Sequence, residues 1–270
     1  DDFINLLESS AIDTPTAIIH MGANSSTTEK DADHLLRNNF EYSKKLAEYS
    51  ISKEIRFIYA SSAATYGDGS LGFDDHEADI HLLRPLNMYG YSKMMFDYWA
   101  LKKGILNKIA GLKYFNVYGP NEYHKGDMRS VVHKAFEQII ETGKARLFKS
   151  GNPKYKDGEQ MRDFIYIKDA VDMTLFFLDH PNKNGLFNIG SGKARTWNDL
   201  VNALFKAMNK EGNIEYFDMP EHLLEKYQYF TEAKMEKVKK PGYSKPHILL
   251  EDGITDYVQN YLLKEKYLGW

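Results

Sequence analysis

The chain has 270 residues, of which 43% are hydrophobic, 27% are charged and 14% are aromatic. This composition is typical of a globular protein with a sizeable core, and it excludes a disordered, collagen-like or coiled-coil chain. The formal net charge of −3 argues against nucleic-acid binding through a generally basic surface. Because the sequence contains no cysteine, it excludes disulfides and thiolate metal sites and favours a reducing compartment, the cytoplasm.

The sequence predicts no membrane span, no signal peptide and no metal site. No apolar run reaches the roughly 20 residues that a membrane span needs, and Asp1-Asp2-Phe3 lacks the basic region typical of a signal peptide. The histidines are scattered without zinc-type spacing, so we expect no metal site.

Short apolar runs alternate with amphipathic ones along the chain. In chain order, they predict strands at 16–21, 55–60, 110–115, 164–167 and 185–189, and helices at 31–50, 88–103, 130–141, 169–178, 197–208 and 248–263. The polar segment 149–162, rich in turn residues, predicts a loop. Strands that alternate with helices favour an α/β fold with a doubly wound parallel sheet.

Tyr89 and Lys93 are four residues apart in the predicted helix 88–103, so their side chains share one face. An ammonium beside a phenol favours the phenolate, and we expect Lys93 to lower the pKa of Tyr89 from about 10 toward about 7. Tyr89 would then be a usable acid and base at neutral pH. The same spacing recurs at Tyr98 and Lys102, where we interpret it as a solvated helix face.

The predicted strand 55–60 runs into Ser61-Ser62-Ala63-Ala64-Thr65-Tyr66-Gly67. Small residues at the carboxyl end of a central parallel strand lie where open α/β sheets bind ligands. By themselves the serines are equally typical of a strand-end turn. With Tyr89 and Lys93 following, we expect the Ser62 hydroxyl to donate to a substrate oxygen while Tyr89 moves its proton.

A serine-rich strand end, followed about 25 residues later by Tyr-x-x-x-Lys, resembles the extended short-chain dehydrogenase/reductase superfamily. Further segments are similar to its motifs in the same order: Gly22-Ala23, Asn38-Asn39, Tyr114–Pro120, Arg162–Asp169 and Phe187–Gly192. The resemblance implies a Rossmann-type sheet in 1–120, the remainder of a dinucleotide-binding domain. It implies a smaller α/β lobe in 121–270, mainly for substrate, with some segments returning to the sheet.

The glycine fingerprint G-x-G-x-x-G, which follows the first strand of such sheets, does not occur in this sequence. The resemblance therefore implies that a strand-helix-strand unit of about 50–70 residues precedes Asp1. We interpret the sequence as lacking the N-terminal strands of the sheet.

Within the superfamily, the chain resembles the ADP-glyceromanno-heptose 6-epimerases. The similarity is carried by His20–Glu29, Ala60–Gly67, Tyr118–Gly126 and Lys226-Tyr227-Gln228. That family inverts C6 of an ADP-linked heptose for the lipopolysaccharide core, with a tightly held NADP that is reduced and re-oxidised within one turnover. The resemblance implies an isomerase with ADP-heptose as substrate and NADP as cofactor, commonly assembled as a homo-oligomer.

The resemblance also implies roles for individual residues. Tyr89 and Lys125 would transfer protons, Ser62 would polarise the reacting oxygen, and Lys93 would hold the cofactor ribose. The implied cofactor-binding residues are Met21, Gly22, Ala23, Asn24, Ser25, Asn38, Lys93, Val117 and Lys125. The implied substrate-binding residues are Asn116, Asp127, His133, Phe148, Lys149, Ser150, Gly151, Arg162 and Tyr227.

Three of these assignments have qualifications of their own. Lys134 is an alternative to His133, because the helix differs from the family by one residue in length. Asp127 stands where the family usually has a small polar residue. Arg162 is expected to grip a phosphate with its forked guanidinium, and a salt-bridged structural arginine is the alternative.

Two other functions stay open. Another nucleotide-sugar epimerase or dehydratase of the superfamily would share Tyr89 and Lys93. A 4,6-dehydratase, however, usually has an acidic pair after the strand-end serine, where this chain has Ala63-Ala64. A non-catalytic dinucleotide-binding protein commonly lacks the tyrosine or the lysine, and both are present here.

Overall fold

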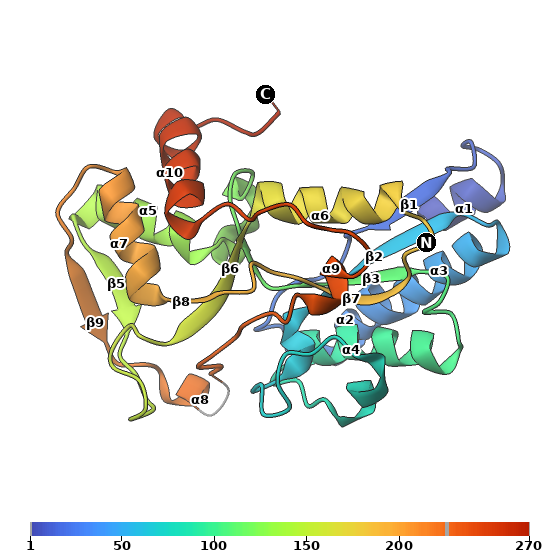
Figure 1. Ribbon diagram of the computed structural model, residues 1–270, viewed down its shortest axis with the longest axis horizontal. Coiled ribbons are helices and arrows are strands. Elements are labelled where there is room, and N and C mark those ends of the chain that lie inside the picture. Colours follow the sequence, from blue (N-terminus) through green and yellow to red (C-terminus); the bar gives the residue numbers. More distant parts are fainter. Residues whose placement is uncertain (1, 225–226, 270) are drawn as a thin grey trace. The chain divides into compact units, whose positions relative to one another are not determined.

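The computed structural model describes residues 2–224 and 227–269 of the chain. They fall into two compact units that alternate along the sequence (Figure 1). The first unit consists of Asp1–Tyr114, Met173–Asn188 and Glu236–Tyr243, and the second of Phe115–Asp172, Ile189–Met235 and Ser244–Trp270. Helices combined with parallel strand pairs confirm the predicted α/β class.

The first unit is built on a parallel sheet with the strand order β1-β2-β3-β7. The strands are β1 (Ala17–His20), β2 (Arg56–Ser62), β3 (Ala110–Tyr114) and β7 (Gly185–Ile189). The helices are α1 (Asp2–Glu8), α2 (Ala32–Leu35), α3 (Tyr42–Ser52), α4 (Met88–Lys102) and α9 (Glu236–Lys239), with 3₁₀ turns η2 (Ala63–Tyr66) and η3 (Glu77–Leu82). Each strand and helix that we predicted in 16–115 is present, with ends shifted by a few residues.

Helices α3 and α4 bury their apolar faces against strand β2. Leu46 and Ala47 of α3, and Phe96 and Ala100 of α4, join Phe57 of β2 in one cluster in which none is more than 2% exposed. Burying a large side chain such as Leu46 or Phe96 is worth about 1.5–3 kcal/mol. This packing fixes α4 on the sheet and brings it against turn η2, which follows β2.

The predicted helix 31–50 is interrupted by a π-helical segment, η1 (Leu36–Glu41), between α2 and α3. A π-turn holds one more residue than an α-turn, and such segments are frequent at functional sites. In η1 the side chain of Asn39 is buried, with an exposed fraction of 1%. The apolar spacing of the sequence, which follows the α-helical period, did not reveal this segment.

The second unit contains two small sheets, one with the strand order β4-β6-β8 and one that pairs β5 with β9. The strands are β4 (Asn116–Tyr118), β5 (Ala145–Phe148), β6 (Met161–Tyr166), β8 (Ala194–Thr196) and β9 (Ile214–Phe217). The helices are α5 (Val131–Thr142), α7 (Trp197–Ala207), α8 (Glu221–Leu224) and α10 (Leu250–Asn260), with 3₁₀ turns η4 (Tyr123–Met128) and η5 (Leu262–Lys264). Helix α6 (Ile167–Asp179) contributes residues to both units.

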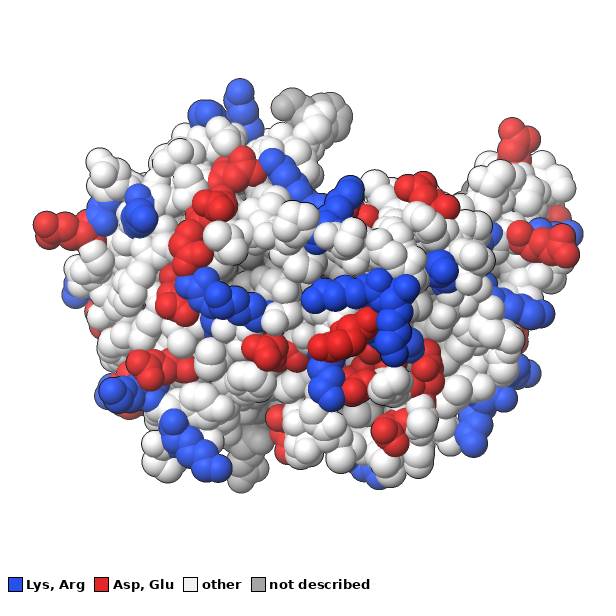
Figure 2. Space-filling model, in the orientation of Figure 1, with Lys and Arg blue, Asp and Glu red and all other residues white. Residues whose placement is uncertain are grey.

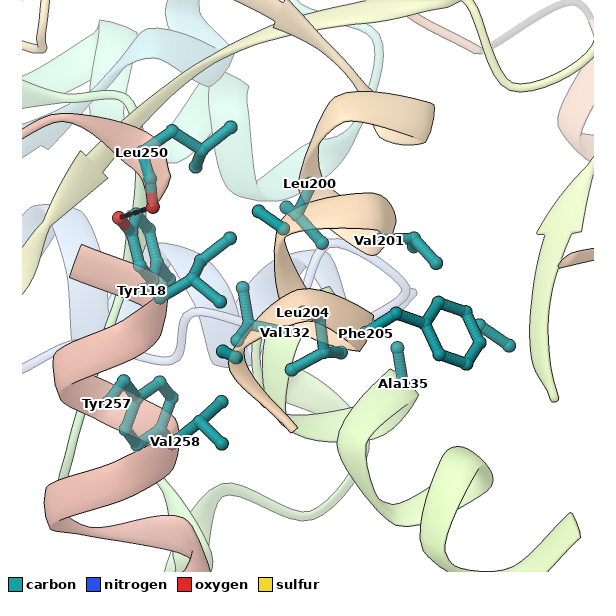
Figure 3. Packing of buried hydrophobic residues seen from close by; sticks show 14 of the residues in the cluster. Tyr118, Val132, Ala135, Leu200, Val201, Leu204, Phe205, Leu250, Tyr257 and Val258 are labelled. Atoms are coloured by element: carbon teal, nitrogen blue, oxygen red, sulfur yellow. Dashed lines mark hydrogen bonds between the residues drawn. The ribbon is translucent and has the colours of Figure 1, made fainter. Parts of the chain in front are cut away.

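The core of the second unit lies among α5, α7 and α10 (Figure 3). Val132 of α5, Leu204 of α7 and Val258 of α10 are fully buried there. The Tyr118 hydroxyl donates a hydrogen bond to the carbonyl oxygen of Leu250 at 3.3 Å, which joins β4 to the start of α10.

Acidic and basic side chains are intermingled on the face seen in Figure 2, in keeping with the small net charge. Among the helices of the described residues, none has both the length and the apolar character that a membrane span requires.

The substitution Gly253→Ala tests how tightly α10 is packed. A Cβ at this position would lie 2.3 Å from the Tyr118 hydroxyl oxygen and 3.1 Å from Cγ of Tyr166. We expect Gly253→Ala to destabilise the protein by about 1–3 kcal/mol through overpacking, although alanine gains about 1 kcal/mol in helix propensity. Urea unfolding measures the change. Gly212→Ala, whose Cβ would meet only Asn202 at 3.6 Å, is the control, and a more stable Gly253→Ala variant would contradict the tight contact.

Candidate active site

The loop Met21–Ser25 follows β1 and lies at the carboxyl end of the parallel sheet. The Asn24 amide donates to Oδ1 of Asn39 at 2.8 Å, and the Asn24 carbonyl accepts from Nδ2 of Asn39 at 2.9 Å. The same Nδ2 donates to the Ser92 hydroxyl of α4 at 2.9 Å. Asn39 therefore ties the loop to helix α4.

Asn38, which the resemblance assigned to the cofactor, has a different environment. It is exposed, and its amide donates to the carbonyl oxygen of His34 in the preceding turn at 2.8 Å. The inward position belongs to Asn39, the second asparagine of the motif. The π-helical register of η1 decides which of the two points inward, and the sequence pattern did not reveal that register.

Ser62 and Tyr89 are brought together at the end of β2. The Ser62 hydroxyl caps turn η2 by accepting from the Ala64 amide at 3.1 Å, and it lies close enough to the Tyr89 hydroxyl to influence its pKa. Gly90 permits the approach, because a Cβ there would lie 2.7 Å from the carbonyl oxygen of Ala64 and 2.8 Å from Cβ of Pro85. The two groups that the sequence paired for chemistry are therefore neighbours.

The electrostatics of this cluster differ from our expectation. Burial raises the pKa of Tyr89, although the nearby Ser62 hydroxyl opposes the change, so the predicted lowering of this pKa is wrong. Lys93 is 4% exposed, and its Nζ donates to the carbonyl oxygen of Ala60 at 2.7 Å. Burial lowers the pKa of Lys93 to about 8, and the negative charge of Asp97 opposes this effect. Desolvation, which a sequence pattern does not report, dominates both groups.

These residues fit a nicotinamide dinucleotide. An ammonium carries three protons, and one of those on Lys93 is used by Ala60. Within 2–224 and 227–269, the other two have no acceptor. Two spare donors beside the Ser62 and Tyr89 hydroxyls, at the carboxyl edge of a parallel sheet, suit the vicinal hydroxyls of a nucleotide ribose.

In the second unit, Lys125 lies in turn η4 after β4. Its side chain is 47% exposed, with Nζ 4.0 Å from Oε1 of Glu122. Glu122 is buried and accepts from the Ser130 hydroxyl at 2.6 Å, which fixes this turn to the start of α5. The burial that we expected for a lysine base is therefore not observed at Lys125.

The other residues assigned to this stretch lie as follows. Asn116 and Asp127 are exposed, and Val117 is half-buried, with its amide donating to the Phe115 carbonyl at 2.9 Å. Asn116 and Val117 belong to β4, a strand too short for the periodicity of the sequence to indicate.

His133, which the resemblance assigned to substrate binding with Lys134 as the alternative, is buried in the structure. Its side chain is 1% exposed, and Nδ1 lies 3.0 Å from the Tyr257 hydroxyl oxygen inside the packing of α5 and α10. Burial lowers its pKa. A side chain enclosed and hydrogen-bonded in this way presents little surface to a ligand. Lys134, the alternative left by the sequence, is half-buried.

Arg162 lies on β6 within a group of aromatic rings. Its guanidinium carbon is 5.2 Å from the Tyr227 ring centre and 5.6 Å from that of Trp197, and Nη1 donates to the carbonyl oxygen of Met161 at 2.8 Å. It is 7% exposed, and in the described part of the chain no carboxylate lies within ion-pair distance. Its neighbour Asp163 is occupied by the amides of Gly192 and Ala233. A buried cation without an anion is costly, so Arg162 is suited to an anionic ligand.

The segment Phe148–Gly151 follows strand β5. The Phe148 ring packs edge-on to Tyr227, with ring centres 6.4 Å apart. Lys149 and Gly151 are exposed, and the half-buried Ser150 donates its amide to Oδ1 of Asp157 at 2.8 Å. Lys226, which carried part of the resemblance, lies outside the described residues.

Comparison with known proteins adds independent findings. The model of the NAD dependent epimerase/dehydratase family matches residues 2–190. An ADP-L-glycero-D-manno-heptose-6-epimerase of Nitratidesulfovibrio vulgaris is 60% identical over 91% of this chain and 76% of its own length. The Fusobacterium nucleatum protein of the same name is 51% identical over 94% of this chain and 79% of its own length. The crystal structure of the Helicobacter pylori enzyme of that name superposes with a TM-score of 0.78 at 28% identity, covering 95% of this chain and 75% of that one.

The burial of Lys93 leads to a prediction about stability. A fall in its pKa from 10.5 to about 8 corresponds to about 3 kcal/mol at neutral pH, and loss of the bond to Ala60 offsets about 1 kcal/mol. We expect Lys93→Met to stabilise the protein by about 1–2 kcal/mol at pH 7. Because the folded-state pKa is the lower one, the charging cost is complete below pH 8 and disappears as the pH rises toward 10.5.

Urea unfolding at pH 7 and pH 10 tests this prediction. The gain from Lys93→Met should be larger at pH 7 than at pH 10. Lys102→Met, at an exposed lysine of the same helix, is the control and should show no such dependence. An equal loss of stability at both pH values would contradict the prediction.

Proposed function

The chain belongs to the NAD dependent epimerase/dehydratase family and, within it, to the ADP-L-glycero-D-manno-heptose-6-epimerases, and from this premise we propose how its residues act. The protein is an isomerase that inverts C6 of an ADP-linked heptose. The observation that carries the mechanism is the proximity of the Ser62 and Tyr89 hydroxyls at the end of β2, with the buried Lys93 on the same helix as Tyr89. A non-catalytic binding role is not favoured, because all three groups are retained.

The chemistry that the chain does not itself supply belongs to a nicotinamide dinucleotide, which when bound accepts a hydride from C6 and returns it to the opposite face. The loop Met21–Ser25 and Lys93 would hold it in the first unit, and Val117 and Lys125 in the second. The family resemblance supports NADP rather than NAD. It also supports a homo-oligomer, and the lack of cysteine supports a cytoplasmic location.

Inversion at C6 requires one proton to leave the hydroxyl and one to return from the other side. We assign these transfers to Tyr89 and Lys125, with the Ser62 hydroxyl holding the reacting oxygen. Burial keeps Tyr89 protonated at neutral pH, which suits the acid step. The Ser62 hydroxyl, which opposes the rise in the pKa of Tyr89, supports the phenolate when Tyr89 acts as a base. Bound substrate would cover Lys125 and exclude water from it, which provides the desolvation that a lysine base requires.

Recognition of the ADP portion is assigned to the second unit. Arg162 would grip the diphosphate bidentately, since its guanidinium is buried and without a carboxylate among the described residues. Phe148 to Gly151 and Tyr227 would line the nucleotide. Asn116 and Asp127 would contact the sugar, and Lys134 would replace His133 at the nucleotide end.

The direct test uses the purified protein with NADP or NAD, each C6 epimer of ADP-heptose, and UDP-glucose. Chromatography should show that the two ADP-heptoses interconvert, faster with NADP than with NAD, and that UDP-glucose is unchanged. Equilibration of the UDP-sugar alone would overturn the assignment.

Tyr89→Phe tests the proton-transfer role in the same assay. We expect turnover to fall by about 10²–10⁴-fold, because the variant lacks the transferable proton, while nucleotide binding by calorimetry persists. Tyr98→Phe is the matched control, since Tyr98 has the same spacing to a lysine on the same helix and only its ring contacts Lys102. Equal activity of the Tyr89→Phe variant and the wild type would show that Tyr89 is not the acid or base.

Arg162→Met tests the diphosphate site. We expect the KM for ADP-heptose to rise by about 10²-fold, because a charge-assisted bidentate contact is lost, with a smaller effect on kcat. Arg146→Met is the control, since Arg146 is exposed and paired with Glu215 on the neighbouring strand. An unchanged KM in the Arg162→Met variant would mean that Arg162 is structural.

A further inference from the structure

A buried ion pair in the first unit is made by two residues to which no ligand contact has been assigned. Nζ of Lys113 on β3 and Oδ2 of Asp97 on α4 are 2.8 Å apart, and the two residues are 1% and 0% exposed. Apolar side chains of similar size are often as stabilising as such a pair, because the desolvation of both charges is expensive. The pair therefore calls for a reason other than stability.

The carboxylate of Asp97 also binds two residues of β2. It accepts from the Tyr59 hydroxyl at 2.8 Å and from the Ser61 hydroxyl at 2.7 Å. The residue between them, Ala60, accepts the hydrogen bond of Lys93 at 2.7 Å. Because Lys93 and Asp97 are one turn apart on α4, three consecutive residues of β2 hold two consecutive turns of the helix.

The ammonium of Lys113 extends the same network to Ser62. It donates to Oγ1 of Thr65 in turn η2 at 2.7 Å, and that hydroxyl donates to the Ser62 carbonyl oxygen at 2.8 Å. Thr65 thus connects the backbone of Ser62 to the Lys113–Asp97 ion pair. Lys93 and Tyr89 are fixed to it through α4.

Among the charged groups near Lys93, Asp97 is the one that stabilises the charged form of this lysine. The groups that act on Lys93 or respond to its charge are His20 of β1 and Asp97 of α4, and Asp97 is itself paired with Lys113 of β3. Burial lowers the pKa of His20 to about 4, and burial raises that of Tyr89, so both are neutral near pH 7. Asp97 is then the anion that supports a charged Lys93.

We propose that Asp97 and Lys113 form a positioning pair that sets the relative placement of Ser62, Tyr89 and Lys93 and keeps Lys93 charged. The proposal rests on the proposed function only for the identity of the reaction that the three groups serve. The pair is assigned no contact with substrate or cofactor, and it acts through β2, η2 and α4.

The experiment replaces Asp97 by Asn and follows kcat, KM and the pH profile of ADP-heptose interconversion. We expect kcat to fall by about 10–100-fold with KM within about 3-fold, because placement in the transition state is lost rather than substrate binding. The alkaline limb of kcat should move to lower pH, since Lys93 loses its anionic neighbour. Lys113→Met should also lower kcat, and Lys113→Arg should restore most of it.

A second measurement needs no turnover. Proteins with ¹³C-labelled lysine are titrated by NMR, with the Lys93 signal assigned from Lys93→Arg. In Asp97→Asn the Lys93 midpoint should lie below that of the wild type. A lower midpoint in a protein that does not interconvert ADP-heptoses would support the positioning pair and reject only the proposed function. An unchanged midpoint together with unchanged kcat would overturn the pair.

Two variants guard against a merely structural effect. Arg56→Met removes a partly buried cation at the other end of β2, where Arg56 donates to the carbonyl oxygens of Phe177 and Lys183. It should lower stability and leave the pH profile unchanged. Thr65→Val keeps the ion pair and cuts its link to Ser62. If Asp97→Asn does not fold, a fall in kcat of about 10-fold in Thr65→Val supports the proposal, and wild-type kcat overturns it.

Discussion

Desolvation of charge on one helix face is the constraint on which the first unit depends. Helix α4 carries Lys93 and Asp97 into the packing against β2, where water is excluded. Each buried charge is tolerated because residues of β2 form hydrogen bonds with it. The Ala60 carbonyl accepts from Lys93, and the Tyr59 and Ser61 hydroxyls donate to Asp97. The position of the helix along the strand is therefore set by polar bonds as well as by apolar area.

The second unit also contains buried charges, Asp163 and Arg162, but they are stabilised in a different way. Asp163 is buried, but backbone amides from two loops satisfy it, so it does not neutralise its neighbour Arg162. The guanidinium is covered by the rings of Trp197 and Tyr227. Flat aromatic surface shields this cation from water without cancelling its charge. The arrangement favours an anionic ligand, either a planar anion or a diphosphate, over a neutral ligand.

Much of the fold and part of the site could be predicted from the sequence. Apolar spacing located α4 and β2, and the strand-end serines with Tyr89 gave the Ser62–Tyr89 pair, because both signals are local. Three outcomes depended on tertiary environment instead. The pKa of Tyr89 follows burial rather than the nearby lysine, His133 is enclosed by Tyr257, and the π-turn selects Asn39 over Asn38. None of these has a signature in residue order alone.

The π-helical segment Leu36–Glu41 also has a consequence for how this chain tolerates changes in length. A π-turn contains one residue more than an α-turn, so deleting a single residue there could convert it to regular α-helix. The helix would continue, and the α3 core could remain packed. The side chain at the Asn39 position, however, would rotate by about 100° around the helix axis, and the Met21–Ser25 loop would lose its anchor. Such a deletion would then have little effect on folding but would disrupt the ligand-binding edge of the sheet.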